Sequence, residues 1–216
     1  MAKESFEARL KQIGVVPIVT LPDVDVAVPM AEALSEGGVG CAEITLRTPD
    51  ALRGLAAIRA ACPDLLLGAG TVLDVAQIAE AIEAGADFVV APGTNPEVVA
   101  ACQERNVPIL PGVTTPSEID FARRLGLRAL KFFPAEPLGG ARTLRVLSGP
   151  FQDVSFVPTG SIVPELLPGY LAVPQVLACG GSWMVDPALL AARDFDRVRK
   201  LAAEARAVVD AARAPQ

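Results

Sequence analysis

The stretch LLLGAGTVLDVAQIAEAIEAGADFVVAPG, residues 65–93, contains one strand–helix–strand unit. The apolar runs Leu65–Gly70 and Phe88–Pro92 are short and nearly continuous, and residues 74–86 between them have helical character. Apolar strands that alternate with helices in this way are typical of parallel strands whose outer face is covered by the helices. This stretch therefore predicts a parallel α/β fold.

The same unit recurs along the whole chain, with an apolar run about every 20 to 26 residues. The runs are Val15–Thr20, Cys41–Leu46, Leu65–Gly70, Phe88–Pro92, Pro108–Gly112, Ala129–Pro134, Ser155–Gly160 and Val176–Gly181. Eight units match a closed (β/α)8 TIM barrel, whereas open doubly wound sheets more often have five or six strands. A solenoid is the other interpretation of the period, but the units share no sequence signature. No linker divides the chain, so we expect one barrel domain over residues 1–216.

The first 14 residues predict a helix added in front of the barrel. Phe6, Leu10 and Ile13 repeat at helical spacing, and Gly14 is placed to end the helix. Acidic and basic residues are mixed here and no long apolar region follows, which does not fit a signal peptide. The longest apolar stretches of the chain are too short to cross a bilayer. We expect a cytoplasmic protein with no membrane partner.

The composition argues against several classes of function. With 51% hydrophobic residues the chain supports a large buried core, and its net charge of −6 disfavours binding to nucleic acid or to an anionic membrane. The sequence contains no histidine. The most common metal ligand and general base is therefore missing, and acid–base chemistry must fall to Glu, Asp, Lys, Tyr or Cys.

The four cysteines are Cys41, Cys62, Cys102 and Cys179, and none of them forms a C-x-x-C pair. A disulfide or a zinc site is one interpretation of such residues. We favour the other, in which they are small apolar residues of a protein kept in a reducing cytosol.

The second apolar run carries a charge where the barrel interior is expected. In a strand of period two, Glu43, Thr45 and Arg47 share one face, and the apolar residues between them share the other. The apolar face suits the helices, so Glu43 points into the barrel and Arg47 lies at its mouth. A buried carboxylate is costly unless it is paired or functional. A structural ion pair of Glu43 with Arg47 or Lys131 is the alternative to a catalytic role.

The sixth run, Ala129–Pro134, places Lys131 among apolar neighbours. If it faces inward, its amine lies in a poorly solvated cavity, where the charged form is disfavoured, and an uncharged amine is what attacks a carbonyl carbon. The alternative is a lysine that extends from a strand end to solvent. An inward lysine together with an inward glutamate predicts Schiff-base formation combined with proton transfer.

The strand ends add polar groups without charge. Thr71 follows Gly70 after the third run, and turn chemistry alone explains most such threonines. After the seventh and eighth runs come the glycine-rich segments 158–162 (PTGSI) and 179–183 (CGGSW). Backbone N–H groups at these two places of a barrel commonly hold a phosphate group. The two segments together predict a phosphorylated substrate.

At this point the sequence resembles the family of 2-keto-3-deoxy-6-phosphogluconate (KDPG) aldolases, some of which also act on 4-hydroxy-2-oxoglutarate. The resemblance extends from about Val15 to beyond Trp183. It rests on the order and spacing of PIVTLPDVDVAVPMAEAL, AEITLRT, LLGAGTVL, VVAPGTNPEVV, ILPGVTTPSE, LKFFPAE, LSGPF, FVPTGSI and GGSW.

The resemblance implies a metal-independent, cofactor-free class I aldolase with a barrel fold that forms homotrimers. It places the Schiff-base lysine at Lys131 and the general base at Glu43. It implies that Arg47 and Thr71 bind the carboxylate of pyruvate. The other substrate-binding positions it implies are Pro92 and Phe133 at the pocket wall and Gly160, Ser161 and Ser182 at the phosphate.

One departure from the family pattern concerns the phosphate end. The family usually has two glycines in the turn after the seventh strand, whereas this chain has Gly160-Ser161. A serine is strained there if the position requires a positive φ. The nearest alternative function is therefore an aldolase for unphosphorylated 4-hydroxy-2-oxo acids. A barrel that only binds a sugar phosphate and a phosphate-binding isomerase are alternatives from other classes, and neither needs an inward lysine.

Overall fold

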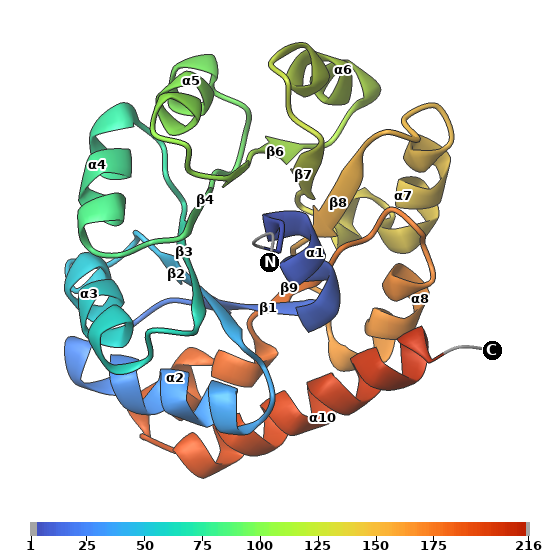
Figure 1. The fold of residues 1–216 in the computed structure, drawn as a ribbon. Helices are drawn as coiled ribbons and strands as arrows, with labels where there is room; N and C mark the ends of the chain where they lie inside the picture. The colour runs from blue at the N-terminus through green and yellow to red at the C-terminus, as the bar shows by residue number, and fades with distance from the viewer. Residues whose placement is uncertain (1–3, 215–216) are drawn as a thin grey trace.

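Strands and helices alternate along the chain in the computed structural model, which describes residues 4–214 (Figure 1). The single domain expected over residues 1–216 includes 1–3 and 215–216, which lie outside the described residues. The elements in chain order are α1 Phe6–Ile13, β1 Val15–Val19, η1 Val24–Val26, α2 Ala27–Glu36, β2 Cys41–Thr45, α3 Ala51–Ala61, β3 Leu66–Gly70, α4 Val75–Glu83, β4 Phe88–Val90, α5 Pro96–Glu104, β5 Ile109–Leu110, β6 Gly112–Val113, α6 Pro116–Arg124, β7 Ala129–Phe132, η2 Glu136–Leu138, α7 Gly140–Ser148, β8 Ser155–Pro158, η3 Pro164–Leu166, α8 Leu167–Leu171, β9 Cys179–Gly181, η4 Trp183–Val185, α9 Pro187–Ala191 and α10 Phe195–Arg213.

The strands form two parallel sheets that curl around a common centre, with the helices outside (Figure 1). One sheet has the order β5-β4-β3-β2-β1-β9 and the other has the order β6-β7-β8. Every ladder between the described strands is parallel. The predicted α/β fold with parallel strands is confirmed.

The fifth predicted strand, 108–112, is divided in the structure. Its first part is β5, which pairs with β4, and its second part is β6, which pairs with β7. Pro111 lies between them and has no N–H to donate to a ladder, although its carbonyl still accepts from the Lys131 N–H at 2.9 Å. The expectation of one continuous strand here was wrong, and a proline visible in the sequence is the cause.

Of the eighth predicted strand, 176–181, only the last three residues form a strand, β9. The segment 176–181 contacts β8 through two isolated bridges, Phe156 with Val176 and Thr159 with Gly180. On the side of β8 that faces residues 175–181, the Phe156 N–H donates to the Gln175 carbonyl at 2.7 Å. Because the N–H groups of a strand point to alternate sides, the next donor on this side would come from Pro158. Pro158 has no N–H, so the ladder is interrupted there.

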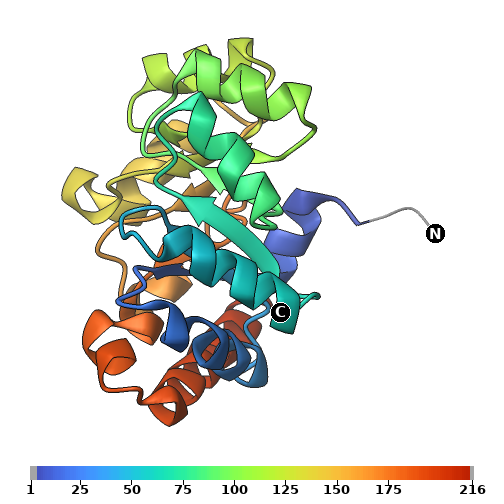
Figure 2. The ribbon, with the colours of Figure 1, turned by 90° about the vertical axis from the view of Figure 1, so that its left-hand side faces the viewer.

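Helix α1 closes the end of the strands from which they start (Figures 1 and 2). Its Leu10 is fully buried in an inner apolar cluster, and the Phe6 ring lies 5.1 Å from the Phe88 ring. The other buried residues of that cluster are Val16, Cys41, Leu66, Phe88, Val90, Leu110, Ala129, Val157, Leu177 and Ala178. Gly14 ends the helix with φ 75°, and its N–H donates to the Leu10 carbonyl. The interior at this end is therefore filled and sealed.

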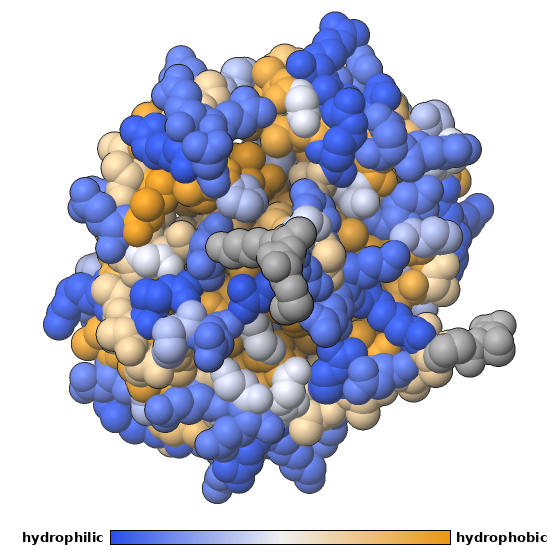
Figure 3. Space-filling model, viewed as in Figure 1, coloured by the Kyte–Doolittle hydropathy of each residue, from blue (hydrophilic) through white to orange (hydrophobic). Residues whose placement is uncertain are grey.

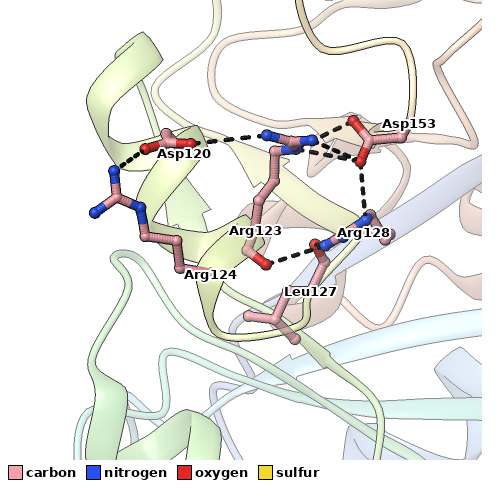
Figure 4. Close-up of polar contacts among 6 residues, drawn as sticks. All are labelled: Asp120, Arg123, Arg124, Leu127, Arg128 and Asp153. Atoms are coloured by element: carbon pink, nitrogen blue, oxygen red, sulfur yellow. Dashed lines mark hydrogen bonds and ion pairs between the residues drawn. The ribbon is translucent and has the colours of Figure 1, made fainter.

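The surface on the α1 side is mainly hydrophilic at its rim, with apolar surface between the helices (Figure 3). A network of charges here joins the end of α6 to the starts of β7 and β8 (Figure 4). Asp153 accepts hydrogen bonds from Arg123 at 2.9 Å and forms an ion pair with Arg128 at 3.1 Å. The hydrogen bonds from Arg123 hold the pKa of the Asp153 carboxyl below its usual value. The ionised Asp153 carboxylate therefore stabilises the fold at any pH above the usual carboxyl pKa. This stabilisation is lost as the pH falls through the lowered pKa of the folded protein.

Among residues 4–214, no helix combines the length and the apolar character needed to cross a membrane.

We predict that Leu10→Ala destabilises the protein by about 2–5 kcal/mol, because it leaves a cavity under the helix that seals the strands. The free energy of unfolding from urea denaturation measures this. The matched control is Lys11→Ala, which changes the next, exposed residue of α1 and is expected to stay within about 0.5 kcal/mol of the parent protein. Equal effects of both substitutions would contradict a sealing role for α1.

Candidate active site

Lys131 lies inside the curled sheet, in the middle of β7. It is held between β6 and β8, in register with Gly112 on one side and Val157 on the other. Only 6% of the residue is exposed. Its Nζ lies 5.1 Å from the centroid of the Phe133 ring. The period-two argument that placed this lysine inside an apolar wall is confirmed by its burial.

Glu43 approaches the same amine from β2. It is 3% exposed, and its Oε1 lies 3.7 Å from the Lys131 Nζ. That separation is longer than a charge-assisted hydrogen bond of about 2.7–2.9 Å. Oε1 accepts no hydrogen bond from any residue that the structure describes. A buried carboxylate oxygen without a donor is costly unless it has a role in binding or catalysis, and this one faces the amine.

Gly70 on the neighbouring strand β3 makes room for this carboxylate. A Cβ atom at Gly70 would lie 2.2 Å from the Glu43 Oε1, which is far inside van der Waals contact. The absence of a side chain at Gly70, the last residue of β3, therefore leaves the space that the Glu43 carboxylate occupies beside Lys131.

Lys131 opens onto a cavity of about 260 Å³ at the end of the strands opposite α1. Its lining combines polar and apolar residues from five strand ends. They are Ile18, Thr20, Arg47, Lys131, Phe133, Thr159, Gly160, Ser161, Ile162, Gly180, Gly181, Ser182, Val185 and Pro187. The cavity thus brings together six of the predicted site residues: Arg47, Lys131, Phe133, Gly160, Ser161 and Ser182.

Arg47 is oriented at the cavity mouth by Thr71. Its Nε–H donates to the Thr71 hydroxyl at 3.0 Å. This leaves the two terminal nitrogens of the guanidinium without a hydrogen bond to the described residues, and such a pair of donors matches a carboxylate. Thr71 has φ 61°, a strained conformation for a β-branched residue. Strained backbone conformations are frequent at functional sites. The sequence alone did not predict the positive φ of Thr71.

The two glycine-rich loops meet at the other side of the cavity. Gly160 has φ 114° and Ser161 has φ 58°. Ser161 was expected to be strained if its position required a positive φ, and the structure shows that this condition is met. The Gly160 carbonyl accepts from the Glu136 N–H, which ties this loop to the segment that follows Lys131. Ser182 comes from the loop after β9.

Pro92 is separated from these residues. It is exposed and lines a different hollow, together with Val72, Leu73 and Thr94. Glu43 and Thr71 are likewise absent from the residues that line the cavity at Lys131. The role of Pro92 at the pocket wall stays a prediction.

Among the cavity residues that the sequence analysis did not assign to the site are two threonines. Thr20 follows directly after β1 and Thr159 directly after β8, and both line the cavity. The signal was their place at a strand end, where side chains of parallel barrels face the substrate.

Among residues 4–214, no group of three or more Cys, Asp or Glu side chains is arranged so as to hold a metal ion. All four cysteines are free thiols. Burial raises the pKa of the Cys102 thiol to about 11 and that of the Cys179 thiol to about 12. These thiols stay protonated and unreactive, in agreement with their interpretation as small apolar residues.

Comparison with known proteins gives one consistent family. The family model described as "KDPG and KHG aldolase" matches residues 6–201. The 2-dehydro-3-deoxy-phosphogluconate aldolase of Treponema pallidum (strain Nichols) is 50% identical over 204 residues, which cover 94% of this chain and 97% of that protein. The KHG/KDPG aldolase of Escherichia coli (strain K12) is 45% identical over 203 residues, covering 94% and 95%.

A solved structure shows the same fold with a ligand. It is KDPG aldolase from Legionella pneumophila with pyruvate captured at low pH as a covalent carbinolamine intermediate. It is 36% identical to this chain, with a TM-score of 0.89, and covers 94% of this chain and 98% of its own.

Proposed function

Because the chain belongs to the KDPG and KHG aldolase family, we propose that it cleaves 2-keto-3-deoxy-6-phosphogluconate into pyruvate and glyceraldehyde 3-phosphate. The observation that carries the proposal is the buried pair behind the cavity, in which the Nζ of the cavity residue Lys131 lies 3.7 Å from the Glu43 Oε1. The covalent pyruvate adduct in the Legionella pneumophila enzyme supports the same chemistry. A barrel without catalytic function and an isomerase do not fit this family.

The first half of the reaction makes the imine. The Lys131 amine attacks the C2 ketone in its uncharged form, and the proton that it loses goes to Glu43 or to water. The carbinolamine hydroxyl then takes up a proton and leaves as water. The resulting protonated imine is an electron sink for the bond to be broken. The Phe133 ring and the apolar strand walls keep bulk water away from it.

The second half breaks the carbon–carbon bond. Glu43 removes the proton of the C4 hydroxyl, the C3–C4 bond breaks, and its electrons move into the imine to give an enamine. Glu43 returns the proton to C3, and water hydrolyses the imine to release pyruvate. Arg47, oriented by Thr71, holds the C1 carboxylate throughout. The N–H groups of Gly160, Ser161 and Ser182 face the phosphate at the other end of the cavity.

The finer features expected from the resemblance belong to the same proposal. The two sheets, with β5 and β6 as one divided strand and the two bridges between β8 and β9, form a closed (β/α)8 barrel with α1 as an added helix. The protein is a single-domain homotrimer of the cytoplasm and works without metal or cofactor. The four free cysteines fit a reducing compartment.

A second candidate function rests on Ser161. Its φ of 58° puts a side chain at a turn that suits glycine, beside the expected phosphate. This favours an aldolase that acts mainly on unphosphorylated 4-hydroxy-2-oxo acids such as 4-hydroxy-2-oxoglutarate.

We predict that sodium borohydride irreversibly inactivates the protein only when pyruvate is present, and that peptide mass spectrometry finds the reduced pyruvyl group on Lys131. Lys131→Met is expected to abolish the trapping. The control Lys200→Met, which removes an exposed lysine of α10, is expected to retain it. Labelling of Lys11 or Lys200 in place of Lys131, or no labelling, would contradict the assignment of the nucleophile.

We predict that Glu43→Gln still forms the trappable imine with pyruvate but loses about 10²- to 10⁴-fold in turnover, because the amide has the shape of the carboxylate and cannot accept the proton. Steady-state kcat for KDPG cleavage measures this. Glu83→Gln, at an exposed end of α4, is the control and should leave kcat unchanged. Unaltered turnover of Glu43→Gln would remove this residue from the mechanism.

We predict that kcat/KM for KDPG exceeds that for 4-hydroxy-2-oxoglutarate by about 10- to 100-fold, because hydrogen bonds to a charged phosphate are worth about 1.5–3 kcal/mol. Parallel assays of released pyruvate with the two substrates measure the ratio. A ratio below one would select the second candidate function.

A further inference from the structure

Thr20 occupies a central position in the cavity wall. It follows directly after β1, is half-buried and lines the cavity with Arg47 and Ser182. Strand β1 pairs with β2, which leads to Arg47, and with β9, which leads to Ser182. Thr20 therefore lies between the residue that holds the carboxylate and the residues that hold the phosphate in the proposed function.

The hydrogen bonds around Thr20 determine which groups it can still bind. The Thr45 hydroxyl is fully buried and lies 2.9 Å from the Val19 carbonyl, to which it donates its one proton. The Thr20 hydroxyl lies 3.0 Å from the Thr45 hydroxyl, which has no second proton to give. Thr20 must therefore donate to Thr45. Its own oxygen then turns only lone pairs toward the cavity, so that it can accept a hydrogen bond but not donate one.

We propose that Thr20 is a specificity-determining residue that accepts a hydrogen bond from a hydroxyl group on the middle carbons of the substrate. The inference rests on the proposed function. With the C1 carboxylate at Arg47 and the C6 phosphate at Gly160, Ser161 and Ser182, the C4 and C5 hydroxyls lie in between. Glu43 takes the C4 hydroxyl proton, which leaves the C5 hydroxyl as the donor for Thr20.

An acceptor at this place discriminates between the two candidate substrates. KDPG carries a hydroxyl at C5, which donates to Thr20. 4-Hydroxy-2-oxoglutarate carries a carboxylate at C5, whose oxygens have no proton and are repelled by the Thr20 lone pairs. The buried Thr45 fixes this orientation, because rotating the Thr20 hydroxyl toward the cavity would leave the Thr45 oxygen without its donor. The threonine pair thus favours a polyhydroxy acid over a dicarboxylate.

The test compares Thr20→Val, Thr20→Ser and the parent protein with both substrates. Valine keeps the shape of threonine and removes the acceptor, whereas serine keeps the hydroxyl. We expect Thr20→Val to lower kcat/KM for KDPG by about three- to tenfold, with kcat/KM for 4-hydroxy-2-oxoglutarate unchanged or raised. Thr20→Ser should stay close to the parent protein. Thr143→Val, in α7 and away from the cavity, is the matched control for the same exchange.

The two assays separate the inference from the proposed function. If the parent protein forms no borohydride-trapped adduct with pyruvate, the proposed function fails. If it does form one, but Thr20→Val has the parent ratio of the two kcat/KM values, the inference is overturned. An equal loss for both substrates with a lowered melting temperature also overturns it, because it shows that the Thr20 hydroxyl only joins β1 to β2. If Thr20→Val does not fold, Thr20→Ala is measured in its place and judged by the same substrate ratio.

Discussion

The structure depends on keeping one amine and one carboxylate together inside an apolar enclosure. Lys131 and Glu43 come from β7 and β2, which lie in different sheets and do not pair with each other, so only the curvature of the sheets brings them within 3.7 Å. Polar groups buried without further hydrogen bonds destabilise a fold unless packing elsewhere offsets the cost. The inner apolar cluster and the Leu10 side chain of α1 provide that packing at the opposite end of the strands.

The groups proposed to contact the substrate come from three parts of the fold. Arg47 and Thr71 follow β2 and β3, the buried pair comes from β7 and β2, and the two glycine-rich loops follow β8 and β9. Lys131 and Glu43 are held within strands, whereas Thr71 and Ser161, both with positive φ, follow the ends of β3 and β8. In the proposed mechanism the strands place the amine and the carboxylate, and the loops hold the part of the substrate beyond the bond that is broken.

The sequence predicted what depends on local periodicity. Alternation along 129–134 and 41–47 was enough to place Lys131 and Glu43 inside, because a strand directs every second side chain to the same face. The role of Pro92 at the pocket wall stays a prediction, since Pro92 lines a hollow other than the cavity at Lys131. The sequence did not predict that the Thr20 hydroxyl acts as an acceptor toward the cavity. This orientation depends on hydrogen bonds with the Thr45 hydroxyl and the Val19 carbonyl, which come from two strands. The interruption at Pro111 was readable from the sequence and was overlooked.

The most direct measurement of the central claim is a crystal structure of the protein after incubation with pyruvate. The account predicts continuous electron density between the Lys131 Nζ and C2 of pyruvate, with the carboxylate against the Arg47 guanidinium and the methyl carbon beside Glu43. Pyruvate bound without a covalent link to Lys131, or Lys131 turned out toward bulk solvent while another lysine carries the adduct, would contradict it.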